Sequence, residues 1–217
     1  EYDISIIEAH HLSGNRADAA ARLFTRLPNY MINSSWYEIN SSQPDTIRDA
    51  NRRFEELARK YAMMYHAEGQ KTKNDELYKT AKTLYAKYLE FFPTTQDAHK
   101  IRFYLAEIQF RENDFVPSAD NYFLVYKDPR AGALRLDSIR YSLGALDKEL
   151  NLQRKKLGLS EITKSTSSKL KEEENDKEIT PYSDVEKRFI DISNVFLNAY
   201  PKEKDAPPVL YQASYLQ

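Results

Sequence analysis

Hydrophobic residues recur at steps of three and four along most of the chain, and polar residues fill the positions between them. That spacing places apolar side chains on one stripe of an α-helix. Over 74–92 the stripe is bounded at both ends, because Asn74 or Asp75 can cap its start and Pro93 stops it. The same spacing predicts helices at 4–12, 17–27, 49–66, 97–112, 115–127, 132–155, 183–200 and 207–217. We therefore predict an all-α fold.

Two stretches interrupt the helical pattern. Residues 29–48 contain Trp36 and Pro44 between polar residues, and we expect an irregular loop there. Residues 158–181 are rich in Ser, Thr, Lys and Glu, which predicts a charged low-complexity insert. The chain then divides into helical repeats over 1–157, the insert, and a further repeat over 182–217 that we expect to continue beyond this fragment.

An internal repeat is visible in the prolines that follow predicted helices. They stand at 93, 129 and 201, so the intervals are 36 and 72 residues. An aromatic residue precedes Pro93 and Pro201, and a short polar loop and an Asp-Ala pair follow each of them. With one gap, the match extends to 104–106 and 211–213. A fixed period of this size indicates stacked supersecondary units.

The second helix of these units has a further signature. Ala81, Tyr85, Tyr88 and Pro93 follow one another at steps of four, three and five, and residues 119, 123 and 126 repeat the first steps as Ala, Phe and Tyr. In this the chain resembles the tetratricopeptide repeat (TPR) family, whose units are helix–turn–helix pairs of about 34 residues. The resemblance implies an α-solenoid of antiparallel helix pairs, a TPR-like superhelix with a groove for a protein or peptide.

Three features depart from the TPR pattern. The Trp-x2-Leu-Gly start of a standard unit is missing, and Ser193 stands at an aromatic position. The polar run from Gly69 to Asn74 predicts an unusually long loop after Ala67.

A narrower resemblance covers roughly residues 50–150. The helix end Tyr-Leu-Glu-Phe-Phe-Pro at 88–93 and the later Ala-Glu-Ile are similar to the barrel-assembly lipoproteins of bacterial outer membranes and to long TPR proteins of gliding bacteria. This implies a non-catalytic scaffold or adaptor in a periplasmic or envelope-associated assembly. The alternatives are the substrate-recognition arm of a larger cell-wall enzyme and a cytoplasmic regulatory TPR domain.

Composition narrows the possible functions. A net charge of −1, from 32 basic and 33 acidic residues, gives no basic footprint for nucleic acid. Cysteine is absent, and no apolar run approaches the roughly 20 residues of a membrane span. There is no phosphate-binding loop or His-Glu-x-x-His motif, and adjacent carboxylates such as Glu55-Glu56 diverge on a helix. We expect no enzyme activity, no cofactor and no metal.

Two groups of residues are candidates for binding. On the 97–112 helix, packing accounts for the apolar positions, so Arg102, Tyr104 and Arg111 are predicted to face a partner. On the 207–217 helix, an apolar face is predicted to lack a partner helix and to favour weak self-association. That second group consists of Leu210, Ala213 and Leu216.

Overall fold

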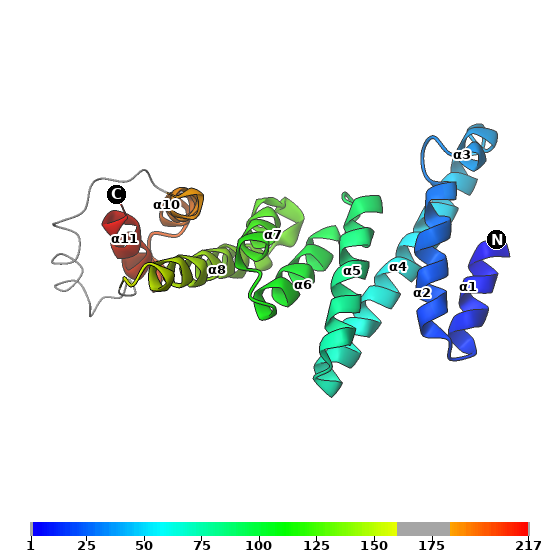
Figure 1. Cartoon of the computed structure of the whole chain (residues 1–217). Helices are drawn as coiled ribbons and strands as arrows, with labels where there is room; N and C mark the ends of the chain where they lie inside the picture. The colour runs from blue at the N-terminus through cyan, green and yellow to red at the C-terminus, as the bar shows by residue number, and fades with distance from the viewer. Residues whose placement is uncertain (1, 160–182, 217) are drawn as a thin grey trace. The chain divides into compact units, whose positions relative to one another are not determined.

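The computed structural model describes residues 2–159 and 183–216, and within these ranges it contains helices and turns but no strand (Figure 1). The all-α fold class is therefore confirmed for the described chain. The predicted insert at 158–181 falls almost wholly on residues outside the described ranges. The α-helices are α1 Tyr2–Leu12, α2 Arg16–Arg26, α3 Ser35–Ile39, α4 Pro44–Thr72, α5 Asp75–Phe91, α6 Ala98–Arg111, α7 Phe115–Lys127, α8 Leu134–Lys156, α10 Asp184–Ala199 and α11 Ala206–Tyr215, with 3₁₀ turns η1 Leu27–Tyr30 and η2 Pro129–Ala131.

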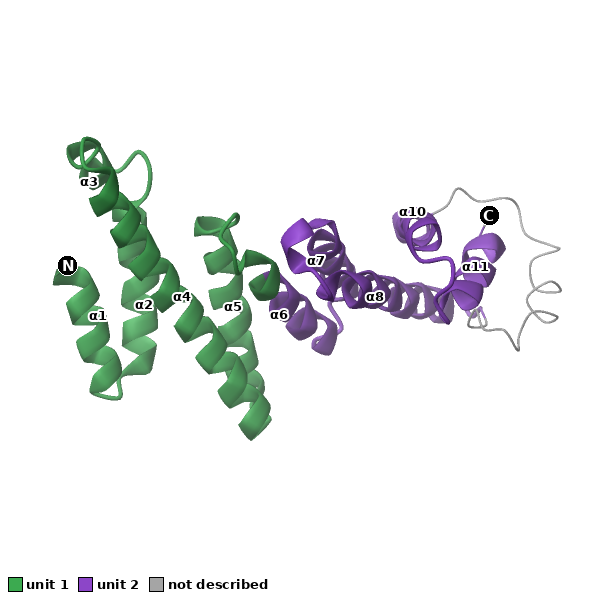
Figure 2. Ribbon diagram, turned by 180° about the vertical axis from the view of Figure 1, so that it is seen from behind, with its two compact units in different colours: residues 1–101 green, residues 102–217 purple. Residues whose placement is uncertain are grey.

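The chain forms two compact units, one over Glu1–Ile101 and one over Arg102–Gln217 (Figure 2). In unit 1, α1 packs on α2, and the longer helices α4 and α5 pack on each other. The turn between α1 and α2 requires a left-handed residue, which Gly14 provides at φ 84°. The core of unit 1 is aromatic, with fully buried Phe54, Tyr61, Tyr85 and Tyr88.

Helix α4 is longer than predicted in both directions. It begins at Pro44, so the expected loop at 29–48 is shortened and also holds η1 and α3. It ends at Thr72, so the long loop expected after Ala67 is wrong. Gly69 stays helical and buried because Tyr78 of α5 packs over it, where an added Cβ would lie 3.4 Å from Tyr78 Cδ2. The chain reverses direction between α4 and α5 over only two residues. Lys73 has φ 54°, and the side chain of Asn74 accepts hydrogen bonds from the amides of Glu76 and Leu77.

In unit 2, α7 packs on α8, α8 on α10, and α10 on α11. Small residues lie where these helices approach closely. Ser118 donates a hydrogen bond from its hydroxyl to the carbonyl of Ala106 on α6 (2.8 Å), and Ser142 of α8 donates to the carbonyl of Ala119 (2.9 Å). Both serines and both alanines are fully buried, so close backbone approach fixes these crossings.

The segment from α5 to α6 and the segment from α10 to α11 correspond residue by residue at an offset of 108 residues. No gap is needed, so the one-gap match predicted from the sequence is corrected. Helix α5 ends at Phe92 with φ −129° and ψ 50°, and α10 ends at Tyr200 with φ −134° and ψ 51°. In both places the amide of that residue donates to the carbonyl four residues earlier at 2.8 Å. The buried positions that correspond are Leu84 and Ile192, Tyr88 and Phe196, Ala98 and Ala206, Ile101 and Val209, Leu105 and Ala213, and Ile108 and Leu216.

The C-terminal helix does not present the predicted open face. Ala213 and Leu216 are buried at 3% and 7% exposure, whereas Leu210 is 55% exposed. One stripe of α11 faces α10 and contains Val209, Ala213 and Leu216. Leu210 follows Val209 directly, so its side chain is rotated by about 100° around the helix from that of Val209. The predicted self-association through Leu210, Ala213 and Leu216 therefore loses its structural basis, because the chain covers two of the three itself.

Candidate functional site

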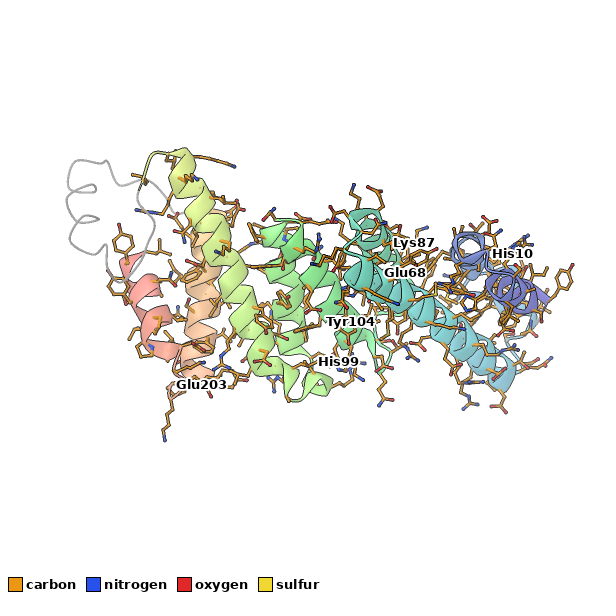
Figure 3. The ribbon with its side chains drawn as sticks, turned by 90° about the horizontal axis from the view of Figure 1, so that it is seen from below. His10, Glu68, Lys87, His99, Tyr104 and Glu203 are labelled. Atoms are coloured by element: carbon orange, nitrogen blue, oxygen red, sulfur yellow. The ribbon has the colours of Figure 1, made fainter. Side chains whose placement is uncertain are left out.

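The repeated turn is held by an arginine in each unit. In unit 2, Arg140 of α8 reaches Glu203 at 2.6 Å and Asp205 at 2.7 Å, just before α11 (Figure 3 labels Glu203 at this turn). In unit 1, Arg59 of α4 lies 3.0 Å from Glu55 and 3.6 Å from Asp97, just before α6. Each arginine joins one helix to the start of a later one, so its guanidinium group is already paired with carboxylates of the chain itself.

A buried tyrosine supports the same turn in unit 1. The Tyr88 hydroxyl donates to Glu55 and lies 2.8 Å from Thr95 Oγ1. Burial and then the hydrogen bond to Glu55 raise the pKa of Tyr88 well above its usual range. The hydroxyl therefore stays protonated and acts as a structural donor.

Unit 2 contains an open pocket of about 410 Å³ between α8 and α11. Buried Phe189 and Phe196 of α10 form part of its apolar lining. Three aspartates and two basic residues line its polar part, so the lining is slightly acidic. They are Asp137, Asp147, Asp205, Arg140 and Lys204.

Gly144 leaves this pocket open on the α8 side. It is exposed within the helix, and a Cβ built on it would meet nothing within 4 Å. A glycine in a helix interior costs about 0.5–1 kcal/mol relative to alanine. Here no close packing accounts for that cost, and the result is accessible backbone beside Tyr141, which also lines the pocket.

An aromatic cluster continues from Tyr141 towards α6. The ring of Tyr141 lies 5.4 Å from that of Tyr122 and 6.0 Å from that of Phe103, while Phe103 and Tyr122 are 5.3 Å apart, centroid to centroid. Tyr122 is buried beneath, whereas Tyr141 is 49% exposed. The cluster thus has a covered base and an accessible rim.

Glu107 lies one helical turn after Phe103, on the same side of α6. Its side chain is half-buried, and burial raises the pKa of its carboxyl group. The pKa of Tyr122 is raised first by burial and then by the charge of Glu107. Within residues 2–159 and 183–216, no hydrogen bond or ion pair engages the Glu107 carboxylate. We call Glu107, Phe103, Tyr122 and Tyr141 the acidic aromatic recess.

The residues predicted for partner binding are not brought together. Arg102 donates to Asn121 Oδ1 at 3.2 Å, and burial lowers the pKa of its guanidinium group. Tyr104 (labelled in Figure 3) is half-buried, and the centroid of its ring lies 6.3 Å from that of Phe103. Arg111 is exposed at the end of α6 and shares a face with Tyr104, while Arg102 lies on the opposite side.

Sequence reasoning missed Glu107 and Tyr141. Glu107 has no neighbouring carboxylate in the sequence, and Tyr141 stands on a predicted helix without a motif around it. One signal was present, namely a single glutamate with Leu105 and Ala106 before it and Ile108 after it. A carboxylate surrounded by apolar positions on a predicted buried helix is costly unless something compensates it.

No protein-family model, curated protein or solved structure matches this chain. Among the described residues, no helix is both long enough and apolar enough to cross a bilayer.

Proposed function

We propose that this chain is a non-catalytic scaffold of the TPR type, which binds a protein or peptide through the pocket of unit 2. The observation that carries the proposal is the open pocket, with buried aromatic residues in its lining, set between helices of a recurring helical framework. Repeat stacks bury their shared faces against neighbouring units, and the surface that remains serves recognition.

The polar groups of the pocket favour binding over catalysis. Asp205 pairs with Arg140, and Asp147 accepts hydrogen bonds from Asn151 (3.1 Å) and Gln212 (2.8 Å). A general acid–base pair would need carboxylates with separated pKa values facing a substrate. Groups engaged with neighbouring side chains instead give a rigid, slightly acidic wall.

The cellular setting is a separate part of the proposal. It rests on the resemblance of residues 50–150 to envelope TPR proteins, which favours an assembly in the periplasm or at the bacterial envelope. The alternatives are a recognition arm of a cell-wall enzyme and a cytoplasmic regulatory domain. Fractionation of the native source, with antibody detection of the full-length product, distinguishes the envelope from the cytoplasm.

Selection from a displayed peptide library tests the binding function. The chain should enrich a defined set of sequences, and Gly144→Phe should abolish their retention, because the new ring projects into the pocket from exposed backbone. Ala86→Phe is the matched control, since Ala86 is exposed on α5 of unit 1. Enrichment of no sequence, or equal retention by the Gly144→Phe and Ala86→Phe variants, would exclude the pocket as a peptide site.

A further inference from the structure

The acidic aromatic recess has the composition of a site for a cation. In the described chain the carboxylate of Glu107 has no hydrogen-bond or ion-pair partner, and it lies one helical turn after Phe103. The ring of Phe103 clusters with those of Tyr122 and Tyr141, and Tyr141 is half-exposed. Aromatic faces attract cations through their quadrupole, and an ammonium group can also donate hydrogen bonds to a carboxylate. Tyr141 belongs to both the recess and the lining of the peptide pocket, so the two share a side chain.

We propose that the recess receives a lysine side chain of the bound peptide, with its ammonium group at Glu107 and its methylene stem against Phe103 and Tyr141. This rests on the proposed peptide-binding function and names the chemistry that the partner supplies.

The carboxylate of Glu107 favours a basic side chain over an acidic or an apolar one. An acidic side chain would meet Glu107 with no basic residue paired to it in the described chain. An apolar side chain would remove water from the carboxylate without replacing its hydrogen bonds, which is unfavourable. The slightly acidic lining of the adjoining pocket, with three aspartates against one arginine and one lysine, favours a basic peptide as well.

A small probe tests the recess independently of any peptide. n-Butylammonium chloride reproduces the lysine side chain, and 1-butanol is its neutral counterpart of equal length. Titration at constant ionic strength, followed by the NMR signals of the Tyr141 and Phe103 rings, should show saturable shifts with the ammonium and none with the alcohol. Equal shifts with both probes, or none with either, would overturn the proposal.

Two glutamate variants identify the group that is responsible. Glu107→Gln preserves size and should weaken n-butylammonium binding about tenfold, the loss expected when a hydrogen bond to a charged group becomes a neutral one. Glu149→Gln is the matched control, because Glu149 lies on α8 and its only hydrogen-bond or ion-pair partner among the described residues is Gln153 (2.9 Å). Circular dichroism confirms that each variant is folded. Unchanged affinity in Glu107→Gln would refute the assignment.

The peptide selection separates this proposal from the proposed function. Sequences enriched on the wild type should share a lysine at one position, and Glu107→Gln should lose that preference while still retaining peptides. Enrichment without lysine would overturn the recess and leave the peptide function standing. Binding of n-butylammonium without enrichment of any peptide would support the recess and overturn the peptide function.

Discussion

Replacing Ala81 by Leu should destabilise unit 1, because the site has no room for a larger side chain. Ala81 is fully buried on α5. Tyr78 and Tyr85, three residues before and four after it, both pack against the ring of His66 on α4, each with ring centroids 5.7 Å apart. His66 therefore lies opposite Ala81, and the added carbons of leucine would push into the imidazole and its contact with Tyr85.

The size of the effect follows from the packing. Inserting carbons into a filled core costs about 1–3 kcal/mol, because neighbouring side chains must leave their preferred rotamers. With a urea dependence of about 2 kcal/mol per molar, the unfolding midpoint of unit 1 should fall by roughly 0.5–1.5 M.

The single tryptophan makes unit 1 observable. Trp36 lies 5.1 Å from the ring of Tyr30, which lies 4.6 Å from the ring of Phe54 in the core. Its emission in urea therefore follows the unfolding of this unit. Ala86→Leu is the control, since Ala86 is exposed on the same helix and the change in helix propensity is the same. We expect the control to stay within about 0.5 kcal/mol of the wild type. Equal midpoints for Ala81→Leu and Ala86→Leu would refute the helix crossing at Ala81.

Three further changes have expected outcomes. Gly144→Ala should stabilise the chain by about 0.5–1 kcal/mol in thermal unfolding, because the methyl group meets nothing within 4 Å and glycine's helix cost is removed. Burial lowers the pKa of His66 in the folded chain, so the unfolded state binds the proton first, and stability should be lost as the pH falls below 6.5. The stability advantage of the wild type over His66→Asn, measured in urea, should accordingly shrink between pH 7.5 and 5.5. Arg140→Met should cost about 1 kcal/mol, since its partners Glu203 and Asp205 are partly exposed, and the difference should narrow at high salt.

Helix positions were predictable from the sequence because their signals are local. Asn74 caps α5 as expected, and every stretch with a clear three-to-four period is helical in the structure. The end of α4 was not predictable in the same way. Residues 69–72 are polar with one glycine, and they stay helical because Tyr78 covers Gly69. That contact forms between α4 and α5, so the pattern of apolar residues along α4 alone does not indicate it.

The candidate site was less predictable than the fold. The sequence predicts Arg102 to face a partner because no apolar packing is expected at its position, yet its guanidinium group donates a hydrogen bond to Asn121 of α7. Glu107 does not stand out in the sequence, although in the described chain its carboxylate has no hydrogen-bond or ion-pair partner. Whether a polar side chain is engaged depends on neighbouring helices, and spacing along one helix does not contain that information.

The two halves of the 108-residue repeat show why the spacing signature of Ala81, Tyr85 and Tyr88 has no counterpart in α10. In α5 the small Ala81 precedes the large Tyr85, whereas in α10 the large Phe189 precedes the small Ser193, and all four are buried. Exchanging large and small residues between adjacent core positions roughly conserves volume, which is what packing requires. The turn, the arginine that holds it and the buried stripe therefore recur while the residue identities change.

The helix that follows each turn shows the same distinction. Ala98 and Ala206 agree, and Leu105 and Ala213 differ only in size. Arg102 corresponds to Leu210 and Glu107 to Tyr215, so chemistry changes at those positions. Positions whose volume is shared between the halves maintain the packing of the helices, whereas positions whose chemistry differs are not held by that requirement.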